Sequence, residues 1–229
     1  MKKRNQFKNE VIDNWHTIPG DICLKSAQKQ GAGNVDNYQN YELAEAMSHC
    51  RHWRNAIDVG AHVGIVSYQL SRSFEHVYSF EINTNLIPCL ELNLKNRDVK
   101  NCTIFPYGAG ARDEFVDLKI TNKTFGTHVV PMSGGTGKFQ TKPLDDFEFE
   151  KIDFIKIDAE GYEPFVALGG MELLKKWRPI ILYERKAHPR RYGYFEDSLV
   201  EILRPLGYDI LKRVGKGHKN AIAGVKHGV

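Results

Sequence analysis

Short apolar runs alternate with segments of helical period along the chain from residue 55 onward. Some of these runs predict β-strands, at Asn55–Val59, His76–Ile82, Asn101–Pro106, Asp153–Asp158 and Pro179–Glu184. The segments between them predict helices, at Ile65–Phe74, Thr84–Asn96 and Pro164–Trp177. This alternation is typical of parallel strands joined by crossover helices, and near-continuous apolar strands belong inside a sheet that is covered on both faces.

The alternation stops towards the C-terminal end. A helix is predicted at Asp197–Leu206, and strands at Tyr208–Val214 and Asn220–Lys226 face each other across Gly215-Lys-Gly217. Because a hairpin reverses the chain, one of these two strands must run antiparallel to the rest. The whole pattern predicts an α/β fold with a seven-stranded, mostly parallel sheet and a C-terminal antiparallel hairpin.

Two regions depart from this regular pattern. Residues 1–54 are expected to form an N-terminal accessory segment with a helix at Tyr41–Trp53, and residues 55–229 one domain. Within that domain, residues from about 111 to about 150 are expected to form a β-rich insertion that covers the functional site. Its strand-like runs and its glycine cluster are Glu114–Thr121, Thr127–Met132, Ser133–Gly137 and Lys138–Pro143.

Composition limits the class of protein. With 229 residues, 41% of them apolar, the chain can bury one sizeable core. No window approaches the roughly 18 apolar residues of a spanning helix, and the charged, polar start is unlike a signal peptide, so no membrane partner and a cytoplasmic location are expected. The four cysteines are far apart without a C-x-x-C pair, so the sequence signals neither a zinc site nor a disulfide framework.

The net charge of +4 is unevenly distributed. Residues 185–229 contain ten Lys and Arg side chains against four acids, and the remainder of the chain is slightly acidic. A basic end can attract an anionic substrate such as a nucleotide, a nucleic acid or a phosphorylated sugar. The lysines are dispersed and few aromatics interleave them, which favours an ordinary solvated surface. Oligomeric state leaves no signal in the sequence.

The most informative loop follows the first predicted strand. The strand ends in Asp58 and turns through Gly60-Ala61-His62-Val63-Gly64 into a helix, an arrangement that suits a nucleotide cofactor because glycine lets the backbone approach the ligand. The dinucleotide fingerprint needs a glycine where this chain has His62, which disfavours an NAD-binding Rossmann oxidoreductase. S-adenosylmethionine has no pyrophosphate, and its cationic groups suit an acid such as Asp58. An ordinary tight turn is the alternative.

The second predicted strand closes with another acid. Glu81, with Ile82 beside it, is placed to accept the ribose hydroxyls of an adenosine. Phe105 or Tyr107, at the end of the third strand, could stack on adenine, although aromatics there more often belong to the core. The predicted contacts to the cofactor are Asp58, Gly60, Ala61, His62, Gly64, Glu81, Ile82 and Asp158.

At this point the sequence resembles a known family. The strings IDVGAHVG (Ile57–Gly64), SFEIN (Ser79–Asn83), FIKIDAEGYE (Phe154–Glu163) and PIILYE (Pro179–Glu184) resemble the FkbM family of S-adenosylmethionine-dependent methyltransferases over about residues 55–185. K-I-D-x-E-G-x-E is the specific part. The resemblance implies the Rossmann-like class I methyltransferase fold, O-methylation, often of sugars or secondary metabolites, and cofactor contacts around Asp58, Gly60 and Glu81. His62 replaces the asparagine usual in the family.

Two carboxylates are candidates for catalysis on strand position alone. Asp158 and Glu184 end the fourth and fifth predicted strands, beside the crevice where ligands of open α/β sheets bind. Methyl transfer needs an aligned acceptor and a base for its proton, and Asp158, Glu184 or His188 could serve. Asp158 and Glu184 could instead hold Mg²⁺, but two carboxylates are few ligands for a hard cation, which favours a metal-free route.

The sequence also offers three weaker candidates for the site and two alternative functions. Glu160 and Glu163 either belong to the site or cap the next helix, and His128 in the insertion reads best as a surface histidine. The preferred partner is a hydroxyl-bearing small molecule, sugar or polysaccharide. Methylation of a nucleic acid or nucleotide is the first alternative, although the chain lacks the D/N-P-P-Y/F/W string of amino-group methylation. A cofactor-binding protein without turnover is another.

Overall fold

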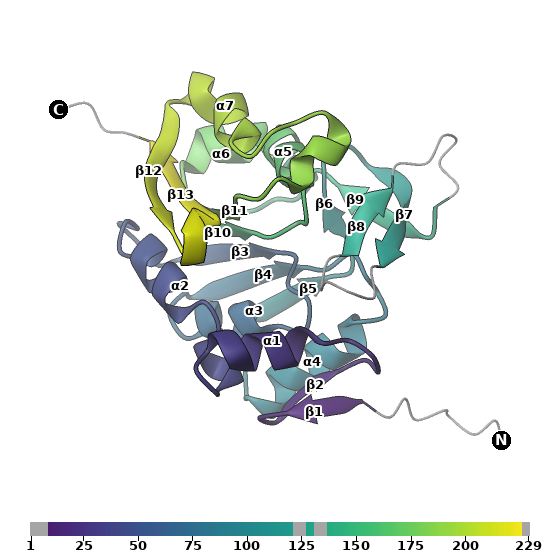
Figure 1. Cartoon of the computed structure of the whole chain (residues 1–229). Helices are drawn as coiled ribbons and strands as arrows, with labels where there is room; N and C mark the ends of the chain where they lie inside the picture. Colours follow the sequence, from purple (N-terminus) through teal and green to yellow (C-terminus); the bar gives the residue numbers. More distant parts are fainter. Residues whose placement is uncertain (1–8, 121–126, 131–136, 226–229) are drawn as a thin grey trace.

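A seven-stranded sheet forms the centre of the molecule in the computed structural model, which describes residues 9–120, 127–130 and 137–225. The strand order is β12-β13-β11-β10-β3-β4-β5 (Figure 1). The strands are β3 (Asn55–Val59), β4 (His76–Phe80), β5 (Cys102–Phe105), β10 (Ile152–Ile157), β11 (Ile180–Glu184), β12 (Tyr208–Val214) and β13 (Asn220–Val225). Strands β3, β4, β5, β10 and β11 pair in parallel, whereas β13 is antiparallel to both β11 and β12. The predicted mostly parallel sheet with an antiparallel C-terminal hairpin is confirmed.

Helices cover both faces of this sheet, so the fold has three layers (Figure 1). One face packs against α2 (Asn40–Met47), α3 (Ile65–Ser71) and α4 (Ile87–Asn96), and the other against α5 (Glu163–Leu168), α6 (Met171–Trp177) and α7 (Ser198–Leu203). Successive strand residues point to opposite faces. In β3, Ile57 and Val59 pack with the α5–α7 layer and Ala56 with the α2–α3 layer.

Several predicted helices are shorter in the structure than the sequence pattern suggested. A single helix over Pro164–Trp177 is wrong, because the chain breaks at Gly169-Gly170 between α5 and α6. A side chain at Gly169 would bring its Cβ to 1.9 Å from the Gly110 carbonyl oxygen, so this close approach requires glycine. The predicted helix Asp197–Leu206 ends as α7 at Leu203 and continues as a 3-10 turn. The five 3-10 helices among the described residues are η1 (Val35–Asn37), η2 (Leu144–Asp146), η3 (His188–Tyr192), η4 (Arg204–Leu206) and η5 (Lys216–His218).

The predicted β-rich insertion forms a separate four-stranded sheet with the order β6-β9-β7-β8 (Figure 1). Its strands are β6 (Gly108–Ala109), β7 (Glu114–Ile120), β8 (Thr127–Val130) and β9 (Phe139–Lys142). Val116 and Val129 are buried against Tyr162, next to the carboxyl end of β10. The predicted glycine cluster Ser133–Gly137 lies outside the described residues except for Gly137, as do the predicted strand ends Thr121, Met132 and Lys226.

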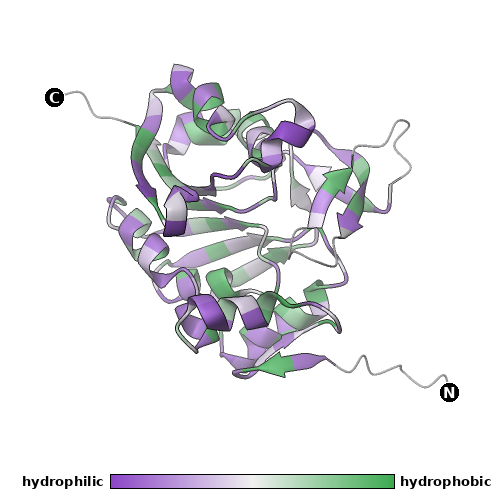
Figure 2. Ribbon diagram, in the orientation of Figure 1, coloured by the Kyte–Doolittle hydropathy of each residue, from purple (hydrophilic) through white to green (hydrophobic). Residues whose placement is uncertain are grey.

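The N-terminal segment packs onto the β3–α3 loop and α4. It contains the hairpin β1 (Glu10–Ile12) and β2 (Trp15–Thr17), then α1 (Cys23–Gln30), which the sequence pattern did not predict. Trp15 is completely buried in a cluster with Leu24, Val63 and Leu86. Figure 2 shows hydrophobic residues along the central strands and many hydrophilic residues in α1 and α2. Within residues 9–120, 127–130 and 137–225, no helix combines the length and apolar character needed to cross a membrane.

Candidate active site

A cavity of about 440 Å³ lies at the carboxyl ends of the central strands. Its walls come from the loop after β3 and from residues at or just after the ends of β4, β10 and β11. Helix α1 and Tyr38 close it on the N-terminal side, and Thr127, Val129 and Thr141 of the insertion close it on another. Ligands of open α/β sheets bind in this crevice, so the cavity is the candidate active site.

The β3–α3 loop is fixed by backbone geometry. Gly60 has a φ of 81°, and a Cβ there would lie 2.0 Å from the Asp158 carbonyl oxygen. The backbone N–H groups of Gly60 and Ala61 both donate to the Phe80 carbonyl, at 3.0 and 2.9 Å. Gly64 has a φ of 91° and packs against Leu90 rather than lining the cavity. Gly60, Ala61 and His62 therefore face the cavity on a loop that needs glycine at its first position.

Asp58 is fully buried and lies beneath the loop rather than in the cavity wall. Its Oδ2 accepts a 2.6 Å hydrogen bond from the Ser67 hydroxyl, which in turn accepts one from Ser79 at 2.8 Å. Burial raises the pKa of Asp58, partly offset by the positive charge of Lys156 on the neighbouring strand. The predicted direct contact of Asp58 with the cofactor stays a prediction.

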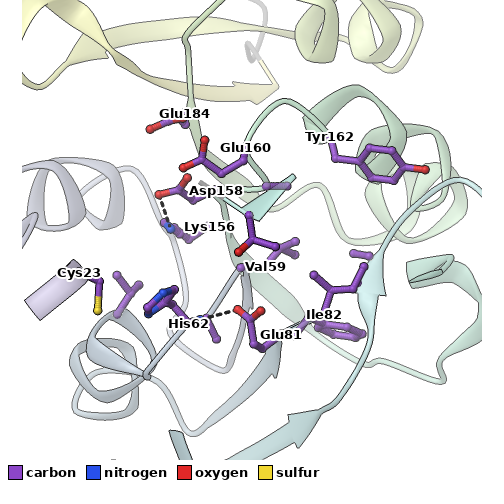
Figure 3. Close-up of a pocket in the computed structure, with 18 of the residues that line it drawn as sticks. Cys23, Val59, His62, Glu81, Ile82, Lys156, Asp158, Glu160, Tyr162 and Glu184 are labelled. Carbon is purple, nitrogen blue, oxygen red and sulfur yellow. Dashed lines mark hydrogen bonds and ion pairs between the residues drawn. The ribbon is translucent and has the colours of Figure 1, made fainter. Parts of the chain in front are cut away.

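Glu81 reaches the cavity as a carboxylate held by the backbone. One oxygen accepts a 2.7 Å hydrogen bond from the His62 N–H, and the other accepts one of the same length from the Asn83 N–H. The side chain is only 5% exposed, and this burial raises its pKa. Because a carboxylate oxygen has more than one acceptor site, both oxygens remain able to bind a hydroxyl. Ile82 lines the cavity beside Glu81 (Figure 3).

Charged side chains gather on the opposite wall, at the ends of β10 and β11 (Figure 3). Asp158 pairs with the buried Lys156, whose Nζ lies 3.2 Å from Oδ2. Glu184 pairs with Lys186 through Oε1 and lies 3.4 Å from His188 Nδ1 through Oε2. The same Nδ1 lies 3.0 Å from Glu160 Oε2. The structure therefore brings together Asp158, Glu184 and His188, the three candidate catalytic residues, and adds Glu160.

These neighbours shift the pKa values in different directions. Burial would raise the pKa of Asp158, but Lys156 and Lys186 outweigh it and lower that pKa. The pKa of Glu184 is raised by burial and by the charge of Asp158. The carboxylates of Glu160 and Glu184, which lie close to its Nδ1, raise the pKa of His188 to about 9. At neutral pH, His188 is therefore protonated, and Glu184 is the more basic of the two strand-end carboxylates.

The weaker candidates from the sequence do not line the cavity, apart from Glu160. Glu163 does not line the cavity; its Oε1 accepts the Ala159 and Gly161 N–H groups at 3.1 and 3.0 Å, so it caps the turn before α5. Phe105 packs with Phe80, Phe147 and Phe149, and neither it nor Tyr107 or His128 lines the cavity.

Sequence reasoning missed other members of the site. The contributions of Cys23, Ser26 and Tyr38 come from a segment without a recognisable motif. Lys156 and Lys186 were also missed. Lys156 did leave a signal, since it interrupts the apolar strand between Ile155 and Ile157, and a lysine there must be paired.

Comparison with known proteins identifies the fold family. The sequence profile of the FkbM methyltransferase domain matches residues 58–210. That range includes the β3–α3 loop, Glu81 and the carboxylates at the ends of β10 and β11. No curated protein matches the sequence significantly.

Solved structures agree on the fold. An FkbM methyltransferase from Methylobacillus flagellatus KT has 16% sequence identity and a TM-score of 0.50, over 76% of this chain and 44% of that one. A precorrin-6y C5,15-methyltransferase from Geobacter metallireducens GS-15 has 16% identity and a TM-score of 0.50, over 94% and 98%. A Streptococcus mutans protein solved in complex with S-adenosylhomocysteine has 11% identity and a TM-score of 0.50, over 80% and 95%. The predicted class I methyltransferase fold is confirmed, and the chain spans less than half the length of the Methylobacillus protein.

Proposed function

The chain belongs to the FkbM family of S-adenosylmethionine-dependent methyltransferases, and we propose that it methylates a hydroxyl oxygen of a sugar, polysaccharide or small metabolite. The observation that carries this proposal is the arrangement of the cavity. Backbone groups and Glu81 form one wall, and Asp158, Glu160 and Glu184 lie on the other (Figure 3). His188 also lines the cavity there, close to Glu160 and Glu184. The first wall suits an adenosine and the second suits the proton of a hydroxyl acceptor.

The cofactor side of the proposal concerns the loop and Glu81. The approach of Gly60 to the Asp158 carbonyl leaves no room for a side chain, so the backbone itself forms this wall. Glu81 then accepts the ribose hydroxyls, and Ile82 contributes apolar surface next to them. When bound, S-adenosylmethionine supplies an electrophilic methyl group on a sulfonium. Loss of the charged Glu81 acceptor alone is worth about 1.5–3 kcal/mol of binding.

On the acceptor side of the cavity, we assign the role of general base to Glu184. A general base works best when its pKa approaches the operating pH, and Glu184 has a raised pKa whereas Asp158 has a lowered one. His188 holds its proton at neutral pH, so it orients Glu184 and Glu160 rather than accepting the hydroxyl proton. Asp158, fixed by Lys156, is left to hydrogen-bond and align the acceptor. Glu184 would take up the hydroxyl proton while the acceptor oxygen bonds to the methyl carbon and the carbon–sulfur bond breaks, with S-adenosylhomocysteine as the leaving group.

Charge balance supports a metal-free route over Mg²⁺ held by Asp158 and Glu184. Each of these carboxylates already has a lysine partner, Lys156 or Lys186, and a divalent cation between them would meet both ammonium groups. We therefore expect that adding Mg²⁺ to protein freed of Mg²⁺ leaves kcat unchanged. A Mg²⁺-dependent rise in kcat that Glu184→Gln removes would instead assign these carboxylates to the metal.

Nucleic acid is the less favoured acceptor class. In the described part of the C-terminal region, much of the positive charge is already paired: Arg185 and Arg213 contact Asp197, and Arg190 contacts Glu196. The chain's single Pro-Cys pair, Pro88-Cys89, lies in α4 with Cys89 buried and outside the cavity wall, so it does not supply a nucleophile for cytosine methylation.

The test uses the acceptor directly. The protein is incubated with methyl-labelled S-adenosylmethionine and separate panels of sugars, polysaccharides, hydroxylated metabolites and RNA, and the label in each product is counted. The proposal expects transfer to a hydroxyl-bearing compound, with loss of transfer in Glu184→Gln. Transfer confined to RNA bases, or to amino groups, would overturn it.

A further inference from the structure

A second cluster of polar side chains lies on the N-terminal side of the cavity, away from Glu184. Asp21 precedes α1, Cys23 begins it, and His62 projects from the β3–α3 loop. His62 Nε2 lies 3.1 Å from Asp21 Oδ2, and one donor atom of each of the three residues lies within 4.8 Å of the others. Figure 3 shows Cys23 and His62 on the same side of the cavity.

We propose that Asp21, Cys23 and His62 bind a zinc ion. A thiolate, an imidazole nitrogen and a carboxylate oxygen are the ligands that Zn²⁺ takes in proteins, at about 2.0–2.3 Å. Donor atoms already within 4.8 Å of one another reach such bonds by small rotations of their side chains. Cys23 and His62 also line the cavity, so the fourth ligand position faces it and is available to water or to an oxygen of a bound molecule.

The surroundings hold one ligand in position before any ion arrives. Asp21 Oδ1 accepts the Cys23 N–H at 2.7 Å, and Oδ2 accepts the Thr17 hydroxyl at 3.0 Å. Such outer hydrogen bonds orient metal ligands and tune their affinity. The Asp21 side chain is 12% exposed and that of His62 is 29% exposed, so the cluster is sheltered but open to an entering ion.

The chemistry separates this cluster from the one at the opposite wall. Glu160, Glu184 and His188 also come within reach of a single ion, but they offer two carboxylates and an imidazole, with Lys186 against Glu184. Only the N-terminal cluster contains a sulfur ligand, which favours zinc over hard cations. A zinc ion there would tie α1 to the cofactor loop, because two ligands come from one segment and the third from the other.

The test measures metal binding alone, so it is independent of any methyl acceptor and of the proposed activity. Chelator-treated protein of residues 1–229 is titrated with Zn²⁺ against a chromophoric competitor, and with Co²⁺ while its thiolate charge-transfer absorption is recorded. We expect one ion per chain and a thiolate band. Cys23→Ser should abolish the band and weaken zinc binding more than about tenfold, and Asp21→Asn and His62→Gly should weaken it similarly.

Matched variants make the result specific. Cys50→Ser removes a half-buried thiol outside the cavity, and His188→Gln removes the histidine of the other cluster; both should keep the band and the affinity. His62→Gly suits the φ of 52° at that position, so the loop keeps its backbone, and circular dichroism checks each fold. Absence of zinc binding, or binding that survives Cys23→Ser but is lost in His188→Gln, would overturn the proposal.

Discussion

The two walls of the cavity are built on different principles. On the wall that we propose for the cofactor, here called the cofactor wall, main-chain groups set the geometry: Gly60 packs on a carbonyl, and Glu81 is held by two backbone N–H groups. On the wall that we propose for the acceptor, here called the acceptor wall, side chains hold one another in place: Asp158, Glu184 and His188 are positioned by lysines and by Glu160. Substitutions on the first wall should therefore change binding of the cofactor, and substitutions on the second should change the rate and its pH dependence.

The largest effect is expected at Gly60. Gly60→Ala forces a left-handed φ on alanine and drives its Cβ into the Asp158 carbonyl oxygen, so unfolding free energy should fall by about 2–4 kcal/mol and cofactor binding should be lost. Gly193→Ala is the matched control, because its φ of 83° is close to the 81° of Gly60 but no atom lies within 4 Å of the added Cβ. That control should cost only about 1 kcal/mol. Equal losses in urea denaturation would mean that the close contact is unimportant.

Glu184→Gln tests the acceptor wall. It keeps the shape of the side chain but removes its basicity, so kcat should fall by about 10²–10⁴-fold while the dissociation constant of S-adenosylhomocysteine stays nearly unchanged. Asp158→Asn should lower kcat less, since Asp158 has the lower pKa. Glu201→Gln, on the outer surface, serves as control. A larger loss in Asp158→Asn than in Glu184→Gln would transfer the role of base to Asp158.

Glu81→Ala tests the cofactor wall by removing one side chain without changing a glycine of the loop. Loss of hydrogen bonds to a charged group should weaken binding of S-adenosylhomocysteine by about 1.5–3 kcal/mol, as measured by calorimetry. In single-turnover experiments at saturating cofactor, the rate of transfer should change little, in contrast to Glu184→Gln. An unchanged dissociation constant would return Glu81 to a structural role in holding the His62 and Asn83 backbone.

The smallest effect concerns pH and stability. The pKa of His188 is raised to about 9 in the folded protein, so its stabilising contribution is complete below about pH 6.5 and is lost as pH rises through about 9. Because the side chain is 30% exposed, solvent screening reduces this contribution to about 1–2 kcal/mol. The difference in unfolding free energy between wild type and His188→Gln should shrink by that amount over this range. A constant difference would mean that the contacts of His188 with Glu160 and Glu184 do not stabilise the fold.

The sequence predicted best what depends on local pattern. The central strands were found because buried parallel strands are continuous apolar runs, and β3 matches its prediction to the residue. The functional importance of the glycines in the β3–α3 loop could be predicted because their backbone conformations disfavour other residues. Helix α1 could not be read, since only Leu24 and Ala27 of its residues are buried and the apolar stripe is too short to show a period.

The direction and the partners of individual side chains were the other limit of prediction from the sequence. Asp58 and Val59 follow each other and so point to opposite faces, which places Asp58 under α3 beside Ser67 and leaves Val59 at the cavity. That alternation was available from the sequence. The grouping of Glu160 with Glu184 and His188, and of Cys23 with His62, joins residues from separate segments, and only the folded chain brings them together.

Titration calorimetry of the wild-type protein with S-adenosylhomocysteine, and separately with NAD, tests most directly that this cavity is a methyl-donor site. We expect one S-adenosylhomocysteine bound per chain, a lower affinity in Glu81→Ala, and no binding of NAD, whose pyrophosphate would meet the His62 side chain. Binding of NAD without S-adenosylhomocysteine, or S-adenosylhomocysteine binding that is indifferent to both Glu81→Ala and Gly60→Ala, would overturn this assignment of the cavity.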